Sequence, residues 1–263
     1  MLLNIIVIVL RETLEASILI SVMLSVGRHY RLGISWLFIA LMAGLIGALF
    51  YALNLGSISD MFDYMGQEVV NASLQYTIYF LLLMVCVAQY HGSSKCLRYL
   101  PMLMGSAVAL AIVREGGELF VFYSGFLQGG ANFLNAATSG FIGLAIGMSA
   151  GALCYYALAA LSSLQVRKTH IILLCFIAGG MVLQATQLLI QADWIPAYEA
   201  IWDSNWLLPE SSITGQIAYA VFGYEATPSL LELIVYLSAI LIMLGLVLLR
   251  RKLTADPPLN AEK

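Results

Sequence analysis

The chain has 263 residues, of which 61% are hydrophobic and 10% are charged, and its mean hydropathy is +0.90. Soluble globular domains carry roughly 45–50% apolar and about 25% charged residues. The composition therefore excludes a soluble globular domain and predicts a polytopic membrane protein whose surface is itself apolar. The formal net charge is only −3, so the positions of the charges are more informative than their sum.

Seven apolar stretches are long enough to cross a bilayer, because a helical span needs about 20 mostly apolar residues. We therefore predict an all-α fold with a single transmembrane domain over residues 1–250. The first stretch has no basic start and its centre is charged, so we interpret it as a retained span rather than a cleaved signal peptide. The expected spans are approximately 2–26, 34–55, 69–90, 102–126, 139–163, 171–191 and 230–250.

Lysine and arginine residues alternate with acidic residues along the connections between these spans. Outside two motifs described below, every Lys and Arg lies in the first, third or fifth connection or after residue 249. The other connections carry no Lys or Arg, and the second and sixth connections carry acids, so the positive-inside rule places the N-terminus outside and the C-terminus in the cytoplasm. We expect residues 192–229, which contain three tryptophans, to form one or two short interfacial helices outside the cell, and residues 251–263 to form a cytoplasmic tail.

The first and fourth spans each carry three charges near the middle. Residues 11–15 read Arg-Glu-Thr-Leu-Glu, and residues 114–118 read Arg-Glu-Gly-Gly-Glu. On a helix the two glutamates of each motif share a face, and the arginine can pair with the glutamate four residues later. Each charge at the bilayer centre costs about 2.5–3.5 kcal/mol, so six of them cost on the order of 15 kcal/mol before pairing.

The position of the two motifs predicts an inverted repeat. They occur at equal depth in two spans that run in opposite directions, so spans one to three and four to six are expected to be inverted halves, with the seventh span added. Sites in transporters of this plan lie at the midplane between the halves. Small residues at every fourth position, which let helices approach closely, follow each motif span: Ala40, Gly44 and Ala48 in the second, and Gly143, Gly147 and Gly151 in the fifth.

Four carboxylates facing two guanidinium groups leave a formal charge of −2, which protons or a cation must balance. A site with oxygen ligands alone suits a hard cation. Salt bridges that only fix the helix register are the structural alternative, but they would not need a second carboxylate in each motif. We expect Glu12, Glu15, Glu115 and Glu118 to be metal ligands, with Arg11 and Arg114 orienting them and keeping them ionised.

The two motifs, extended to residues 11–17 in the first case, resemble the paired signatures of the high-affinity iron permease family, the oxidase-dependent iron transporters found in yeast and bacteria. Residues 222–229, Phe-Gly-Tyr-Glu-Ala-Thr-Pro-Ser, are similar to the family's approach to its last span. Thr13 replaces the usual glycine of the first motif, and Gly117 replaces the usual leucine of the second. The adjacent glycines Gly116 and Gly117 predict a weak or bent point in the helix of the fourth span.

The resemblance implies a multi-pass permease of the cell membrane, expected to be the bacterial inner membrane, that imports iron through the four motif glutamates. It further implies ferric iron, delivered by an extracytoplasmic oxidase or iron-delivery protein. We expect no permanently bound cofactor, no nucleic-acid partner and no enzymatic activity. Two alternatives stay open: a proton-coupled carrier of another divalent metal or of a small organic solute that uses the same glutamates, and an intramembrane protease, which is disfavoured because no span contains histidine.

Three polar residues at the outer end of the third span share one helix face and could form an access path to the site: Glu68, Asn71 and Gln75. Their alternative role is an ordinary helix-end carboxylate with interhelical amide bonds. A glutamine stripe on the sixth span is expected to form interhelical hydrogen bonds through Gln184, Gln187 and Gln191.

Glu232 follows Ser229 at the spacing of a capping box, which we favour over a role as a metal ligand. The histidines all lie in basic connections and are expected to be solvated or to face lipid headgroups. They are His29, His91 and His170.

Overall fold

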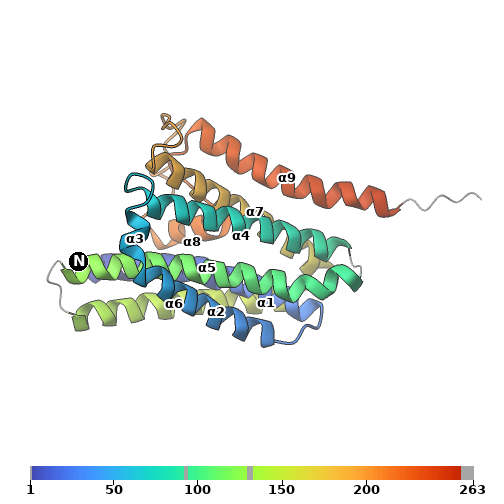
Figure 1. Cartoon of the computed structure of the whole chain (residues 1–263). Coiled ribbons are helices and arrows are strands. Elements are labelled where there is room, and N and C mark those ends of the chain that lie inside the picture. The colour runs from blue at the N-terminus through green and yellow to red at the C-terminus, as the bar shows by residue number, and fades with distance from the viewer. Residues whose placement is uncertain (1, 92–93, 129–132, 256–263) are drawn as a thin grey trace, which may run out of the picture.

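The computed structural model describes residues 2–91, 94–128 and 133–255, and within these ranges the chain is all-α, with one isolated β-bridge and no strand. Figure 1 shows the long helices lying side by side along one direction. The described helices are α1 (Leu2–His29), α2 (Ser35–Leu53), α3 (Leu55–Ser59), α4 (Gly66–His91), α5 (Ser94–Gln128), α6 (Phe133–Ala159), α7 (Ser163–Gln191), α8 (Ile213–Phe222) and α9 (Leu230–Ala255).

Six helices are long and apolar enough to cross a membrane, namely α2, α4, α5, α6, α7 and α9. The chain is therefore a multi-pass membrane protein. α1 is as long as these helices at 28 residues, but its composition differs because Arg11, Glu12 and Glu15 interrupt its apolar sequence.

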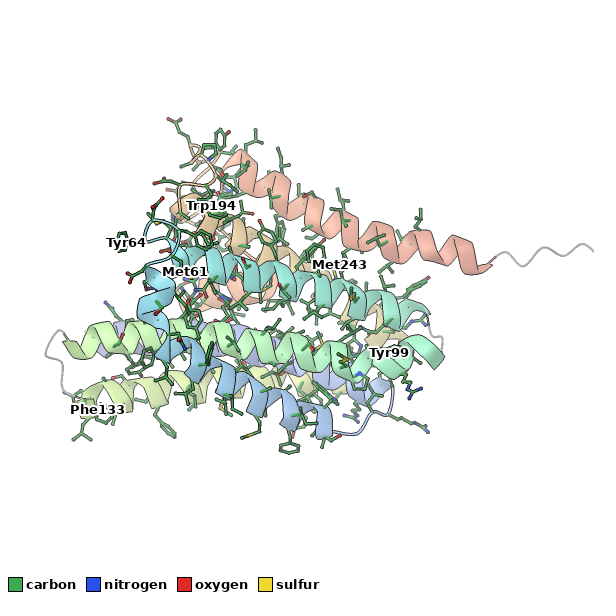
Figure 2. The ribbon with its side chains drawn as sticks, in the orientation of Figure 1. Met61, Tyr64, Tyr99, Phe133, Trp194 and Met243 are labelled. Carbon is green, nitrogen blue, oxygen red and sulfur yellow. The ribbon has the colours of Figure 1, made fainter. Side chains whose placement is uncertain are left out.

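The two ends of the bundle differ in what they carry. The N-terminus, α3 and the start of α9 lie at one end in Figure 1, and α9 finishes at the other. The acidic connections around α3 and before α9 therefore share one end of the molecule. This acidic end also carries exposed aromatic side chains, including Tyr64 and Trp194 (Figure 2), and Trp194 packs edge-on against Phe62 with the ring centroids 5.6 Å apart.

The helices pack mainly in three pairs, α1 with α6, α2 with α5, and α4 with α7. Glycine makes the first pair close. A Cβ atom added at Gly147 would lie 2.7 Å from Cβ of Thr13, and one at Gly151 would lie 2.6 Å from Cβ of Ser17. The Ser17 hydroxyl donates a hydrogen bond to the Gly147 carbonyl oxygen at 2.9 Å. The α6 ladder thus brings the backbone of α6 directly against α1.

The α2–α5 pair is close for the same reason. A Cβ atom at Gly44 would lie 2.7 Å from Cβ of Ile112, and one at Gly117 would lie 2.7 Å from Cδ1 of Tyr51. Gly116 faces Ala48 at a similar distance. α5 runs through both motif glycines as one helix. The two glycines therefore serve the approach of α2, where we had expected a weak point.

Several helices extend beyond the predicted spans. α5 begins at Ser94, and Pro101 lies inside it. α7 begins at Ser163, where Ser162 and Gln165 form a capping box. Residues that looked like short basic connections are therefore helical, because helix capping and propensity continue past the edge of the apolar sequence.

The segment 192–229 contains one helix, α8, and none of the three tryptophans belongs to it. α8 packs against α1 and α7 rather than standing apart from the bundle. Its ends are defined by the Ser212 hydroxyl, which accepts a hydrogen bond from the Gly215 N–H at 3.0 Å, and by Gly223, whose φ of 64° is left-handed. Residues 256–263 of the expected tail lie outside the described residues.

His170 is buried, so the expectation that it is solvated was wrong. It is fully enclosed, and its Nε2 lies 2.8 Å from the Ser25 hydroxyl oxygen. The reason is the early start of α7, which carries residue 170 two turns into the bundle. His29 is half-buried with its ring 6.2 Å from that of His170, and the side chain of His91 lies outside the described part of the chain.

A substitution in the α6 ladder tests the packing of α1 against α6. We expect Gly147→Ala to lower the free energy of unfolding by about 1–3 kcal/mol, because the added methyl group overpacks the contact with Thr13. The measurement is the thermal unfolding midpoint of the purified protein in detergent. Gly245→Ala is the matched control, since nothing lies within 4 Å of its added Cβ; equal midpoints for the two variants would contradict the packing.

Candidate metal centre

The centre of the bundle contains a buried guanidinium group that contacts three carboxylates. Arg114 is only 4% exposed. Its Nη1 donates hydrogen bonds to Glu15 Oε2 and Glu115 Oε1, both at 2.8 Å. Its Nε donates to Glu118 Oε1 at 3.0 Å. Arg114 therefore joins both motifs, since Glu15 belongs to α1 and the other two glutamates belong to α5.

Three of the four motif glutamates form a group that could hold a metal ion. Carboxylate oxygens of Glu12, Glu115 and Glu118 all lie within 4.8 Å of one another. Oxygen ligands lie about 2.0–2.6 Å from hard cations, so two ligands on opposite sides of one ion are about 4–5 Å apart. The spacing of these oxygens fits a single hard cation. We call these three residues the carboxylate cluster.

The cluster contains acceptor atoms that no donor satisfies. Oε2 of Glu12 and Oε2 of Glu115 are buried and have no hydrogen-bond partner among the described residues. Leaving a buried acceptor unpaired costs about 1–3 kcal/mol, and more when the group is charged. A cation or a proton between these oxygens would remove that cost.

Glu15 has a different environment from the cluster. Its Oε2 accepts hydrogen bonds from Arg114 Nη1 and, at 3.1 Å, from Gln184 Nε2. Its Oε1 lies 3.5 Å from Arg11 Nε. Glu15 thus has two hydrogen-bond donors on Oε2 and only a long ion pair on Oε1, and it balances the charge of Arg114. The two glutamates of the first motif are chemically distinct, although they share a helix face.

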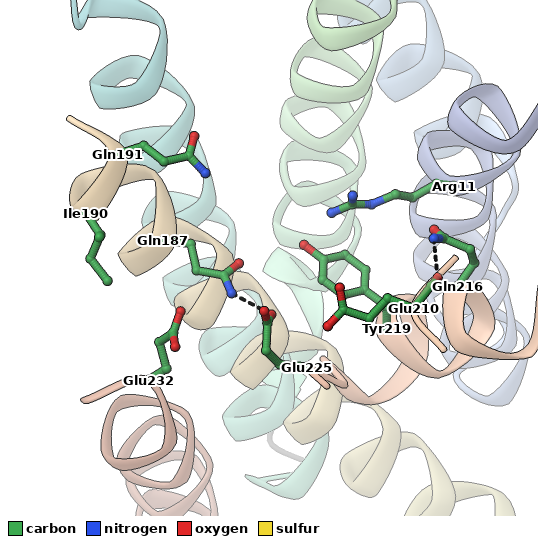
Figure 3. A pocket seen from close by; sticks show the side chains of 9 residues that line it. All are labelled: Arg11, Gln187, Ile190, Gln191, Glu210, Gln216, Tyr219, Glu225 and Glu232. Atoms are coloured by element: carbon green, nitrogen blue, oxygen red, sulfur yellow. Dashed lines mark hydrogen bonds between the residues drawn. The ribbon is translucent and has the colours of Figure 1, made fainter. Parts of the chain in front are cut away.

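Two cavities lie between the cluster and the acidic end of the bundle. The larger one, which we call the vestibule, has a volume of about 390 Å³ and is lined by Glu210, Glu225 and Glu232 together with amide side chains (Figure 3). The smaller one, the central cavity, has a volume of about 260 Å³ and includes Glu118 in its lining. Both cavities are lined by Arg11, Gln187, Gln191 and Tyr219.

The predicted access residues line the central cavity. Glu68, Asn71 and Gln75 all contribute to its wall. Asn71 Nδ2 donates a weak hydrogen bond to Glu118 Oε1 at 3.4 Å. Oxygen atoms of all three residues are buried without a hydrogen-bond donor in the described part of the chain. The cavity therefore presents acceptor oxygens from α4 next to Glu118.

Of the three glutamines in the α7 stripe, Gln184 forms the predicted interhelical hydrogen bonds, whereas Gln187 bonds to the connection between α8 and α9. Gln184 Oε1 accepts from Gln75 Nε2 at 2.7 Å, while its Nε2 donates to Glu15. Gln187 donates to Glu225 Oε2 at 2.6 Å. Burial raises the pKa of Glu225, and the hydrogen bond from Gln187 acts in the opposite direction. The stripe thus links the carboxylates of the site to the vestibule.

The Ser229–Glu232 capping box is also confirmed. Glu232 Oε2 accepts from the Ser229 N–H and hydroxyl groups at 2.7 Å each, and the Glu232 N–H donates to the Ser229 hydroxyl oxygen at 3.4 Å. Glu232 therefore caps α9, although its side chain also lines the vestibule.

The sequence analysis missed Tyr219. This residue lies on α8, and its ring stacks under Arg11, with the guanidinium carbon 4.1 Å from the ring centroid. Burial raises the pKa of the Tyr219 phenol, so the ring stays neutral. The only signal in the sequence is an aromatic residue in a short apolar helix, which has no pattern that links it to the motif in α1.

The two motif arginines should differ in their effect on stability. We expect Arg114→Gln to destabilise the protein by about 3–5 kcal/mol, because it removes the partner of two buried carboxylates, Glu15 and Glu115, and of the partly exposed Glu118. Arg11→Gln should cost much less, because the Arg11 side chain is 39% exposed and has one long ion pair. Thermal unfolding in detergent compares them, and equal losses would contradict the central role of Arg114.

Comparison with known protein families matches residues 2–254 to the family described as the Iron permease FTR1 family. The match covers nearly the whole chain, including both motifs, the vestibule and α9. No curated protein and no solved structure matches the chain.

Proposed function

Because the chain belongs to the iron permease FTR1 family, we propose that it imports iron across the cell membrane through the carboxylate cluster of Glu12, Glu115 and Glu118. Membership in a permease family indicates iron transport across a membrane rather than an enzymatic reaction. The main support for the proposed site is that three carboxylates lie close enough together to bind a single ion. Two of them also have a buried oxygen without a hydrogen-bond donor.

In this proposal α1 is a seventh span. Its 28 residues would extend about 42 Å at 1.5 Å per residue, more than the bilayer core of about 30 Å. Its charged residues contact α5, α7 and α8 and so need not face lipid. Seven spans place the two termini on opposite sides, and the distribution of Lys and Arg favours an external N-terminus and a cytoplasmic C-terminus.

The inverted repeat is supported by the helix pairing. If α1, α2 and α4 correspond to α5, α6 and α7, then the α1–α6 pair corresponds to the α5–α2 pair. Both pairs are close at glycine residues, and each contains one motif helix. The remaining pair, α4 with α7, corresponds to itself, and Gln75 meets Gln184 across it. This relation is that of two halves about a twofold axis in the membrane plane.

The route that we propose begins at the acidic outer end. Acidic side chains raise the local concentration of cations there. The ion passes from the vestibule to the central cavity, along Glu68, Asn71 and Gln75, and reaches Glu118. Glu118 is the link between the two environments, because it lines the central cavity and belongs to the cluster.

We further propose that the transported ion is ferric and that an extracytoplasmic oxidase or iron-delivery protein supplies it at the bacterial inner membrane. The ligands are carboxylate oxygens, and hard oxygen donors favour the smaller, more highly charged ion. Glu15 remains with Arg114 as a charge pair in this scheme, and Arg11 and Arg114 act as charge partners rather than as ligands.

Amide substitutions in the cluster test the site. Glu12→Gln and Glu118→Gln should each lower iron-dependent growth and radioactive iron uptake by at least about tenfold in cells without other iron-uptake routes, because each removes a charged ligand. Glu199→Gln is the control, as it removes an exposed acid of the outer segment. Unchanged uptake in both cluster variants would rule out transport through these residues, and uptake of an organic solute instead would favour the alternative carrier.

The location of bound iron gives a second test. A crystal soaked with iron should show one anomalous peak at the iron edge between Glu12, Glu115 and Glu118. A peak confined to the segment 192–229 would instead assign the motifs to a structural role.

The oxidation state can be tested without the partner protein. Cells that express this chain alone should accumulate iron faster from ferric citrate than from ferrous iron that ascorbate keeps reduced, because the carboxylate oxygens bind the harder ion more tightly. The Glu118→Gln variant gives the background for both forms. Faster uptake of the ferrous form would contradict the ferric proposal while leaving iron transport intact.

A further inference from the structure

The two motifs place their arginines very differently, although their sequences match. Arg114 is 4% exposed and donates to three carboxylates. The side chain of Arg11 is 39% exposed, and its one described ion pair, to Glu15 Oε1, is 3.5 Å long. Something other than the carboxylates of the site must therefore hold the guanidinium of Arg11.

That contact is the ring of Tyr219. The guanidinium carbon of Arg11 lies 4.1 Å from the ring centroid, well inside the range of about 6 Å for a cation–π interaction. In Figure 3 the Arg11 side chain crosses above this ring, and no dashed line connects it to the glutamates drawn beside it. Tyr219 belongs to α8, which packs against α1 and α7 and is capped at both ends, so the ring is held in place.

Arg11 and Tyr219 lie where the two cavities meet, since both residues line the vestibule and the central cavity. On the proposed route, an ion that moves from one cavity to the other passes near this guanidinium, because Arg11 lines both cavities. Its positive charge opposes the ion, and the opposition grows as the guanidinium approaches the carboxylates, because it then competes for the same oxygens.

We propose that Tyr219 is a positioning residue that holds Arg11 beside the route of the ion and away from the carboxylate cluster. Without the ring, the guanidinium is free to close on Glu15, four residues along the same helix, and to move toward the cluster. Tyr219 thereby sets how tightly the site binds the incoming cation. This inference rests on the proposed function, since it concerns the ion that the cluster binds.

Substitutions at Tyr219 separate the ring from the hydroxyl group. Tyr219→Leu should raise the iron concentration that gives half-maximal uptake by about fivefold, the scale of one cation–π contact, with a smaller effect on the maximal rate. Tyr219→Phe keeps the ring and should stay within about twofold of the parent. Tyr219→Met is a second variant without a ring, and its side chain is closer to tyrosine in length. It should behave as Tyr219→Leu does, and it replaces Tyr219→Leu in the experiment if that variant does not fold.

A double substitution distinguishes positioning from a structural role. If Tyr219 acts through Arg11, then Tyr219→Leu should change the iron concentration for half-maximal uptake by less than about twofold when Arg11→Gln is also present. A purely structural residue would have the same effect in both backgrounds. The inference is overturned if Tyr219→Leu raises the iron concentration for half-maximal uptake by the same factor in both backgrounds. It is also overturned if Tyr219→Phe raises this concentration as much as Tyr219→Leu does, or if neither ring-free variant raises it threefold.

Two controls complete the experiment. Val221→Ala shortens another side chain of α8 that packs against the core. The iron concentration for half-maximal uptake should stay at the parent value in this variant. The amount of folded protein in the membrane is measured for every variant. Failure of the proposed function can be distinguished from failure of this inference. If the proposed function is wrong, Glu12→Gln and Glu118→Gln leave iron uptake intact, whatever the Tyr219 variants do.

Discussion

The structure depends on one guanidinium group that is buried among carboxylates inside an apolar bundle. Arg114 contacts Glu15, Glu115 and Glu118, and so it ties α1 to α5 at mid-length. A charge in such a place is stable only when it is paired and hydrogen-bonded. Arg114 meets that requirement with two of its nitrogen atoms, and the carboxylates still exceed the guanidinium groups in number. The excess negative charge is what the cation of the proposed function would balance.

The rest of the fold serves to bring these groups together. Glycines on α6, α2 and α5 let each motif helix lie close to its partner, because only one helix of each contact contributes a side chain. α4 and α7 close the site laterally through the Gln75–Gln184 bond, and Gln184 then reaches Glu15. α9 packs outside this arrangement, against α7 and α4. The polar lining continues from the site to the acidic end of the bundle through the two cavities.

The sequence predicted what depends on local spacing. The pairs Arg114–Glu118 and Arg11–Glu15 follow from the four-residue repeat of a helix, and the Ser229–Glu232 box follows from its three-residue spacing. The sequence did not predict what depends on how helices are rotated and where they begin. The contact of Arg114 with Glu15 across two helices, the burial of His170 and the stacking of Arg11 on Tyr219 are all of this kind, because only packing decides them.

The close glycine contacts of α1 with α6 and of α2 with α5 have a mechanical consequence. The close contacts favour movement of each pair of helices as one unit, and the proposed ligands are divided between the two pairs: Glu12 belongs to α1, and Glu115 and Glu118 belong to α5. A displacement of one pair against the other by even 1–2 Å, about the size of helix shifts in switching proteins, opens or closes the coordination sphere itself. If the carboxylate cluster binds the ion as proposed, its release would need no chemical change in any ligand, only a wider gap between the two pairs of helices.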